Sequence, residues 1–156
     1  MAERSKTDLP GLAELERQLR SLEDVATSTK ILRGSLSFAA KPMREEAQRL
    51  APVADKTIVR AGTEIAPGTL RDSIRVRTFR GGEGPEDGRH AAASAYLYFT
   101  RKGFWGNLLE FGNKHARAAP MLRPAFDQCA RGAVDRFGKS LGRRIKRALK
   151  RRASQA

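Results

Sequence analysis

The chain has 156 residues, of which 31 are Lys or Arg and 17 are Asp or Glu, so its formal charge is +14. Its length suits one compact domain of about 100–200 residues. No apolar run reaches the roughly 18–20 residues of a membrane-spanning helix, and no apolar stretch follows the N-terminus as in a secretory signal. The single cysteine, Cys129, excludes an internal disulfide framework and a thiolate metal cage. A strong positive charge suggests nucleic acid as the first partner to test.

The N-terminal third has the apolar periodicity of helices. Four leucines with 3-4-3 spacing form an apolar seam: Leu12, Leu15, Leu19 and Leu22. A second helical pattern runs from Ile31 to Leu50 and contains Pro42. Proline in a helix interior costs about 3 kcal/mol unless the helix bends or restarts. We therefore expect a kink, or two helices that meet near Lys41-Pro42.

The middle of the chain predicts a small sheet. Residues 53–68 are expected to form a loop with a short strand around Thr57 to Arg60. Alternation over residues 69–79 predicts a half-buried strand, in which Ile74, Val76 and Thr78 share one face and Arg75 and Arg77 the other. A glycine-rich stretch, residues 81–88, predicts a mobile connection. Residues 91–100 predict a second strand, antiparallel to the first.

Much of the positive charge lies near the C-terminus. Between Arg131 and Arg152 there are ten basic residues and one acid, so this stretch carries +9 and the rest of the chain only +5. The stretch also belongs to an amphipathic helix, whose apolar residues recur every three or four positions: Phe126, Ala130, Val134, Phe137, Leu141, Ile145 and Leu149. The helix is predicted to cover the domain with solvated charges outward. Two alternatives are phosphate contacts with nucleic acid and membrane-surface binding, although no Trp lies here.

The pattern as a whole predicts an α+β fold with N-terminal helices, a small mainly antiparallel sheet and a C-terminal amphipathic basic helix. We expect one domain over residues 1–152. Its helical part spans residues 8–51, its sheet and loops residues 52–111, and its basic helix residues 120–152. Residues 153–156 are expected to fray.

Residues typical of catalysis are scarce. His90 and His115 have no metal-ligand spacing and are interpreted as loop histidines. Residues 132–140 resemble a phosphate-binding loop, but they have five residues between the glycines instead of four and lie in a helical pattern. Glu110 lacks a partner for acid–base chemistry, and Cys129 is interpreted as a small buried hydrophobe. We expect no enzyme activity, no cofactor and no metal.

Three segments in order resemble a family of tailed-phage proteins. The first segment includes Leu9-Pro10-Gly11-Leu12, Lys41-Pro42 and Leu50-Ala51-Pro52-Val53. The second segment is Gly68-Thr69-Leu70-Arg71-Asp72-Ser73-Ile74. The third segment includes Leu108-Leu109-Glu110-Phe111-Gly112-Asn113 and then Ala119-Pro120-Met121-Leu122-Arg123-Pro124-Ala125-Phe126. Over residues 8–130 the chain resembles the small tail-completion, minor-tail or head–tail joining proteins. It departs from them at residues 55–66, an insertion, and in the loop at 81–88.

The resemblance implies a structural virion protein that forms a ring, expected to be a hexamer, at the head-proximal end of the tail. Its implied partners are further copies of itself, the tail-tube protein, a neck or head-closure protein, and genome DNA that passes through the lumen without sequence-specific binding. It implies a location in the virion neck or tail after assembly in the host cytoplasm, with no membrane. A head-closure ring next to the portal and a sequence-independent DNA-binding architectural protein are the alternatives.

Two groups of residues are candidates on this interpretation. The first group would define the fold, with Phe111 buried, Gly112 as a positive-φ exit and prolines at the entry to the final helix: Pro52, Leu70, Ile74, Phe111, Gly112, Pro120 and Pro124. The second group would contact another subunit or the neck: Phe104, Trp105, Glu110, Arg143, Arg144 and Arg147. Exposed aromatic side chains concentrate at interfaces, and the basic helix could line the lumen or, as we favour, meet an acidic neighbouring ring.

Overall fold

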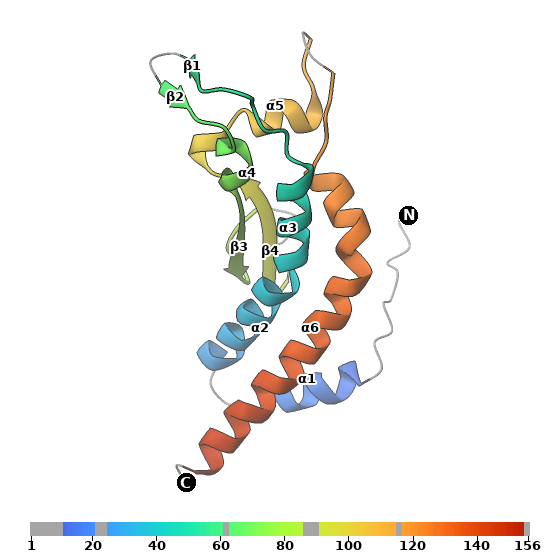
Figure 1. The fold of residues 1–156 in the computed structure, drawn as a ribbon. Coiled ribbons are helices and arrows are strands. Elements are labelled where there is room, and N and C mark those ends of the chain that lie inside the picture. Colours follow the sequence, from blue (N-terminus) through green and yellow to red (C-terminus); the bar gives the residue numbers. More distant parts are fainter. Residues whose placement is uncertain (1–10, 21–24, 61–62, 86–90, 115–116, 155–156) are drawn as a thin grey trace.

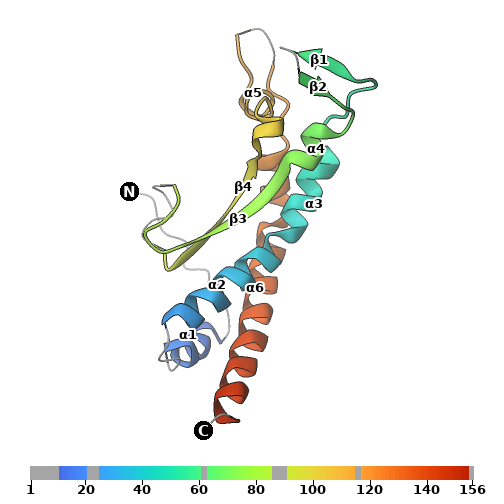
Figure 2. The same cartoon turned by 90° about the vertical axis from the view of Figure 1, so that its left-hand side faces the viewer.

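The computed structural model describes residues 11–20, 25–60, 63–85, 91–114 and 117–154. Figures 1 and 2 show a long C-terminal helix with the other elements along it. In chain order these are α1 (Leu12–Arg20), α2 (Val25–Ala39), α3 (Lys41–Leu50), β1 (Ile58–Arg60), β2 (Thr63–Ile65), α4 (Thr69–Ser73), β3 (Ile74–Arg80), β4 (Ala93–Phe99), the short 3-10 helix η2 (Arg101–Gly103), α5 (Gly106–Phe111) and α6 (Leu122–Ala153).

The elements form layers. Strands β3 and β4 pair in an antiparallel sheet, α2 packs on both strands and α3 on β3, and α6 lies against α2 and α3 away from the sheet (Figure 1). Helix α1 packs against α6. The predicted α+β fold is therefore confirmed. Within the described residues, no helix combines the length and apolarity needed to cross a bilayer.

The predicted break near Pro42 is confirmed. Helix α2 ends at Ala39, and α3 begins at Lys41 with Pro42 in its first turn. A proline is tolerated there because the first N–H groups of a helix have no partner in the preceding turn. The amide of Ala40 still donates to the carbonyl of Leu36 at 2.9 Å, so the two helices follow each other almost without a gap. Of the predicted leucine seam, Leu22 lies outside the described residues.

The strand predicted over residues 69–79 begins later than expected. Residues Thr69–Ser73 form the one-turn helix α4, and the strand starts at Ile74. Gly68 has φ of 81°, which reverses the chain before the turn, and the Thr69 hydroxyl donates to the Ala66 carbonyl at 2.7 Å. Leu70 and Ser73 are both buried, as their spacing of three residues requires in a helix but not in a strand. This part of the prediction was wrong because Leu70 and Ser73 do not fit the alternation that begins at Ile74, and both face inward from one helical turn.

The two predicted strands do pair. The register runs from Ile74 opposite Phe99 to Arg80 opposite Ala93, and Arg75 and Arg77 lie on the exposed face as predicted. The connecting loop is described over residues 81–85; residues 86–88 of the predicted mobile connection lie outside the described residues. The expected short strand near residue 58 is β1, which pairs with β2 in a hairpin of its own.

The core consists of three clusters distributed along α6. The first lies between α3, α4, β3 and the start of α6: Ala47, Ala51, Leu70, Ile74, Met121 and Ala125. The second, in the middle, joins Ala39, Met43 and Ala133. The third joins Ile31 of α2 to Leu141 and Ile145 of α6. Alanines in the first two clusters let the helix backbones approach closely. The long basic helix α6 is therefore packed against the rest of the domain at three places along its length.

Candidate subunit interface

Glu110 connects α5 to the start of α6. Its carboxylate accepts hydrogen bonds from the backbone N–H groups of Met121 at 2.7 Å, Leu122 at 2.9 Å and Arg123 at 3.0 Å. The first N–H groups of a helix lack intrahelical acceptors, and a negative charge is favoured there by the helix dipole. The next residue, Pro124, has no N–H to satisfy. One carboxylate therefore caps the whole first turn.

This geometry decides what Glu110 does. The residue is only 7% exposed and its oxygens accept from the three backbone donors, so its carboxylate stabilises the fold. Glu110 also lines part of the apolar groove described below, and its contact with another subunit stays a prediction. The Glu110 carboxylate has no partner nearby in the sequence, and its partners lie more than ten residues away in the chain. Spacing could not reveal them, because the donors are backbone groups that any residue carries.

Most other fold-defining candidates lie at the same end of the molecule. Leu70 and Ile74 are buried in the first core cluster, and Gly112 ends α5 with φ of 74°, as predicted. Pro52 follows α3, and Pro120 and Pro124 flank the start of α6. The predicted burial of Phe111 is wrong, since its side chain is 71% exposed. On a helix of six residues, Leu109 and Glu110 occupy the inward positions, and Phe111 is left pointing outward.

Phe126 departs from its prediction in the same way. It was placed on the buried stripe of the final helix, but it is 57% exposed. Further along α6 the stripe holds: Leu141 and Ile145 are buried, with Phe137 and Leu149 packed beside them. Cys129 packs beside Ala39, Met43 and Ala133, but it is half-buried and not fully buried as predicted. The sequence periodicity continues to Phe126, but the neighbouring elements do not cover it.

Phe111 and Phe126 line an apolar groove. The groove has a volume of about 960 Å³ and lies between α2, α3, β4, α5 and α6, with a lining that includes Leu36, Met43, Leu97, Phe111, Phe126 and Val134. A contiguous apolar surface open to solvent is unusual on a monomer and marks an interaction site. Sequence periodicity gives no sign of this surface, because it predicts both phenylalanines to lie in the core.

A second apolar surface lies on the β1–β2 hairpin, which includes most of residues 55–66, the stretch where the sequence is expected to depart from the resembled family. The two strands pair with each other, and the hairpin stands at the same end of the molecule as α5 (Figures 1 and 2). Val59 is 67% exposed, Ile58 49%, and the preceding Val53 50%. An isolated two-stranded hairpin is only marginally stable in water, so further contacts would stabilise it.

The residues predicted to contact another subunit lie in two separate places. Phe104 is 62% exposed and stacks edge-on against Trp105 at a centroid distance of 5.6 Å, whereas Trp105 itself packs against the first core cluster. Three arginines lie in the C-terminal half of α6: Arg143, Arg144 and Arg147. The Arg143 guanidinium is 5.8 Å from the centre of the Phe38 ring. The structure therefore does not bring the aromatic and basic candidates together.

The residues considered for phosphate or metal binding have the following positions in the structure. Residues 132–140, which resemble a phosphate-binding loop, lie inside α6, as their helical pattern predicted. His90 and His115 both fall outside the described residues. Within the described ranges, His, Cys, Asp and Glu form no group of three that could hold a metal ion.

Comparison with known proteins supplies the family. The family model described as "Bacteriophage HK97-gp10, putative tail-component" matches residues 13–112. The match covers α1 to α5 and ends at Gly112, short of the expected limit at residue 130, so all of α6 lies beyond it. No curated protein and no solved structure gave a significant match. Because the match spans more than half of the chain, the protein belongs to the HK97-gp10-like family of phage tail components, a structural class of virion protein.

Proposed function

We propose that this tail component is a ring-forming subunit at the head-proximal end of the tail, where it completes the tail and joins it to the neck. Membership of a phage tail family provides the setting. The observation that supports a ring is the presence of two unlike apolar surfaces on one chain. One is the groove lined by Phe111 and Phe126, and the other is the hairpin with the exposed Val59.

Two unlike surfaces favour a head-to-tail arrangement. When a patch on one subunit binds a different patch on the next, the contact repeats, and a ring forms if the rotation closes. In this arrangement the hairpin of one copy lies in or beside the groove of its neighbour and covers Phe126. A hexameric ring would match the tail tube, with the tail-tube protein on one side and a neck protein on the other.

Self-association of the purified protein tests the ring. Phe126→Asp places a charge in the groove and is expected to leave a folded monomer, whereas the unaltered protein forms a ring by mass measurement and negative-stain electron microscopy. Tyr98→Asp is the matched control, because Tyr98 is also exposed but lies on the sheet, outside the groove lining. Normal rings from Phe126→Asp would contradict the proposed interface.

Function in the phage tests the role. A phage that lacks the gene is expected to accumulate filled heads and separate tails, because the tail is neither completed nor joined. The unaltered gene supplied in trans should restore joining, and the Phe126→Asp gene should not. Infectious particles of normal tail length without the protein would contradict the proposed role.

A further inference from the structure

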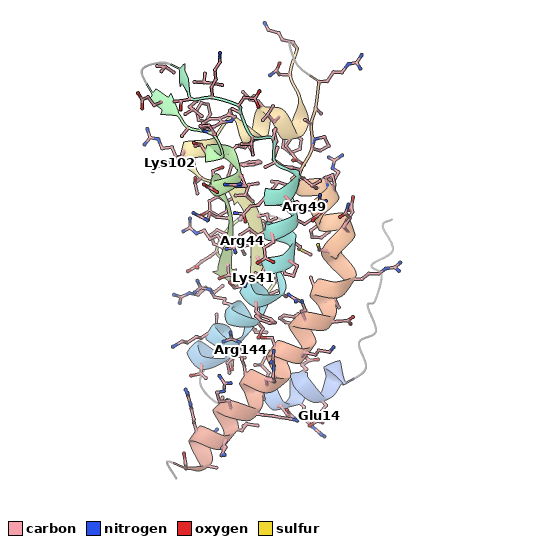
Figure 3. The ribbon with its side chains drawn as sticks, viewed as in Figure 1. Glu14, Lys41, Arg44, Arg49, Lys102 and Arg144 are labelled. Atoms are coloured by element: carbon pink, nitrogen blue, oxygen red, sulfur yellow. The ribbon has the colours of Figure 1, made fainter. Side chains whose placement is uncertain are left out.

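A second pocket, unlike the apolar groove, lies where α2, β3 and α6 meet. Its volume is about 860 Å³, and apart from one glycine the residues that line it are of polar or basic types: Thr29, Lys30, Arg33, Gly34, Ser37, Thr78, Arg80 and Arg144. Four of these eight residues are cationic and none is acidic. Figure 3 shows Arg144 on α6 beside α2, at the end of the molecule away from Arg49 and Lys102.

The three arginines of the pocket come from three different elements, and each has a polar contact within the protein. Arg33 donates to the Thr78 carbonyl at 3.2 Å and lies 3.4 Å from the Thr78 hydroxyl. The Arg144 Nε is 3.4 Å from the Ser140 hydroxyl. Arg80 contacts one carboxylate, Glu83 at 3.3 Å. A guanidinium has five N–H donors, so each arginine keeps donors for a ligand.

Gly34 makes room for Arg144. A Cβ on Gly34 would lie 2.7 Å from Nη1 and 2.9 Å from Cζ of Arg144, closer than real contacts allow. The guanidinium therefore lies across α2 at the one position that has no side chain. Glycine inside a helix costs about 1 kcal/mol relative to alanine, so the close approach of Arg144 gives this glycine a structural use.

The charge continues beyond the pocket. Arg147 and Arg151 follow Arg144 at three and seven positions, on the same side of α6, and extend the cationic surface by about 10 Å at 1.5 Å per residue. Both side chains are exposed. Among the described residues, Lys30, Arg144, Arg147 and Arg151 form no ion pair. The surface thus fits a polyanion longer than one phosphate.

We propose that this pocket and the adjoining stripe of α6 bind the sugar–phosphate backbone of duplex DNA, without sequence specificity. Arginine forks suit phosphate oxygens, which they contact through two hydrogen bonds. An acidic protein segment would share the charge, but protein interfaces have an apolar core, and no apolar side chain lines this pocket. Interfaces with DNA are more polar and more positive. The inference goes beyond the proposed ring and does not require it.

Fluorescence anisotropy with two labelled duplexes of unrelated sequence tests the site, over about 50 to 200 mM KCl. Both duplexes are expected to bind equally, with affinity falling as salt rises. Combined replacement of Lys30, Arg80 and Arg144 by alanine should reduce the slope of log affinity against log salt by about 2 to 3, since each phosphate contact contributes about 0.9. The matched control removes the same charge at the other end of the molecule, by Arg71→Ala, Arg101→Ala and Lys102→Ala, and should keep the slope.

Gly34→Ala separates a built site from general attraction, because it changes no charge and displaces Arg144. We expect it to weaken DNA binding by about tenfold, as the loss of one well-placed charged contact does, and Arg144→Gln should do the same. Thermal melting confirms that the variants are folded. Equal losses in the pocket variant and its control, undiminished binding by both Gly34→Ala and Arg144→Gln, no binding at about 50 mM KCl, or stronger competition by polyglutamate than by unlabelled DNA would each overturn the proposal.

Discussion

The two ends of α6 use charge in opposite ways. At the N-terminal end, the Glu110 carboxylate is buried and accepts three backbone N–H groups. At the C-terminal end, arginines such as Arg147 and Arg151 are exposed and form no ion pair among the described residues. A buried charge must be fully hydrogen-bonded to be tolerated, whereas an exposed one remains free to meet a partner. The first end therefore maintains the fold, and the second is suited to binding.

The family match divides the molecule at nearly the same point. It ends at Gly112, just after the capping glutamate, and the basic helix lies beyond it. Helix α6 is nevertheless part of the packed domain, because its residues Ala125, Ala133 and Ile145 belong to three core clusters along its length. Structural and binding residues are therefore separated by their position along α6 and not by the total charge of the chain.

The largest expected effect is at the capped end. Glu110→Ala leaves three N–H groups without their acceptor, and each unsatisfied buried donor costs about 1–3 kcal/mol. We expect the free energy of unfolding in urea to fall by about 4 kcal/mol, with a smaller fall for Glu110→Gln, which keeps one oxygen acceptor. Glu64→Ala, which removes an exposed carboxylate, should change stability by less than about 0.5 kcal/mol. Equal effects of Glu110→Ala and Glu64→Ala would show that the cap is not needed.

The next test asks whether the basic half of α6 is packed as firmly as the capped half. Ile145→Ala removes a fully buried side chain between Ile31 and Leu141 and should lower stability by about 3 kcal/mol. Ile74→Ala, at the other end, should cost a similar amount because Ile74 is equally buried. Urea unfolding of both variants checks this. A negligible loss for Ile145→Ala alone would mean that the basic half is held loosely.

Two glycines sharpen the comparison further. A Cβ on Gly103 would clash with the Ser73 hydroxyl, so Gly103→Ala should destabilise the protein by about 2 kcal/mol. Gly132, inside α6, has open space around it, and Gly132→Ala should stabilise the protein by about 0.7 kcal/mol through helix propensity. Thermal melting measures both. The same sign of change for the two variants would contradict the packing described at one of these sites.

The smallest effect concerns the exposed pair Glu46–Arg49 on α3. The hydrogen bond from Arg49 lowers the pKa of Glu46 below its ordinary value of 4.5, with the positive charge of Arg49 as a lesser cause. The contribution to stability is therefore present above that ordinary value and is lost as the pH falls through the lowered pKa. Arg49→Ala should remove this small pH-dependent part of the unfolding free energy, as urea titrations at neutral and acidic pH would show. Parallel pH profiles for the two proteins would contradict it.

Much of the fold could be predicted because its signals are local. Pro42 indicated the helix break, alternation after Ile74 indicated a strand, and the apolar spacing around Leu141 and Ile145 indicated the long helix. The short turn of α4 could not be distinguished from a strand in five residues. The candidate site could be predicted less well, because it depends on contacts between segments that are distant in the sequence. The Glu110 carboxylate accepts from backbone N–H groups of α6, Phe126 is not covered by its neighbours, and the Arg144 side chain lies against Gly34. Periodicity predicts none of these three features.

Electron microscopy of intact particles tests the central claim most directly. With the protein labelled at its C-terminus, beyond α6, the label should appear as a ring at the head-proximal end of the tail, between the tail tube and the neck. Label along the whole tube, at the distal tip or inside the head would contradict the proposed role.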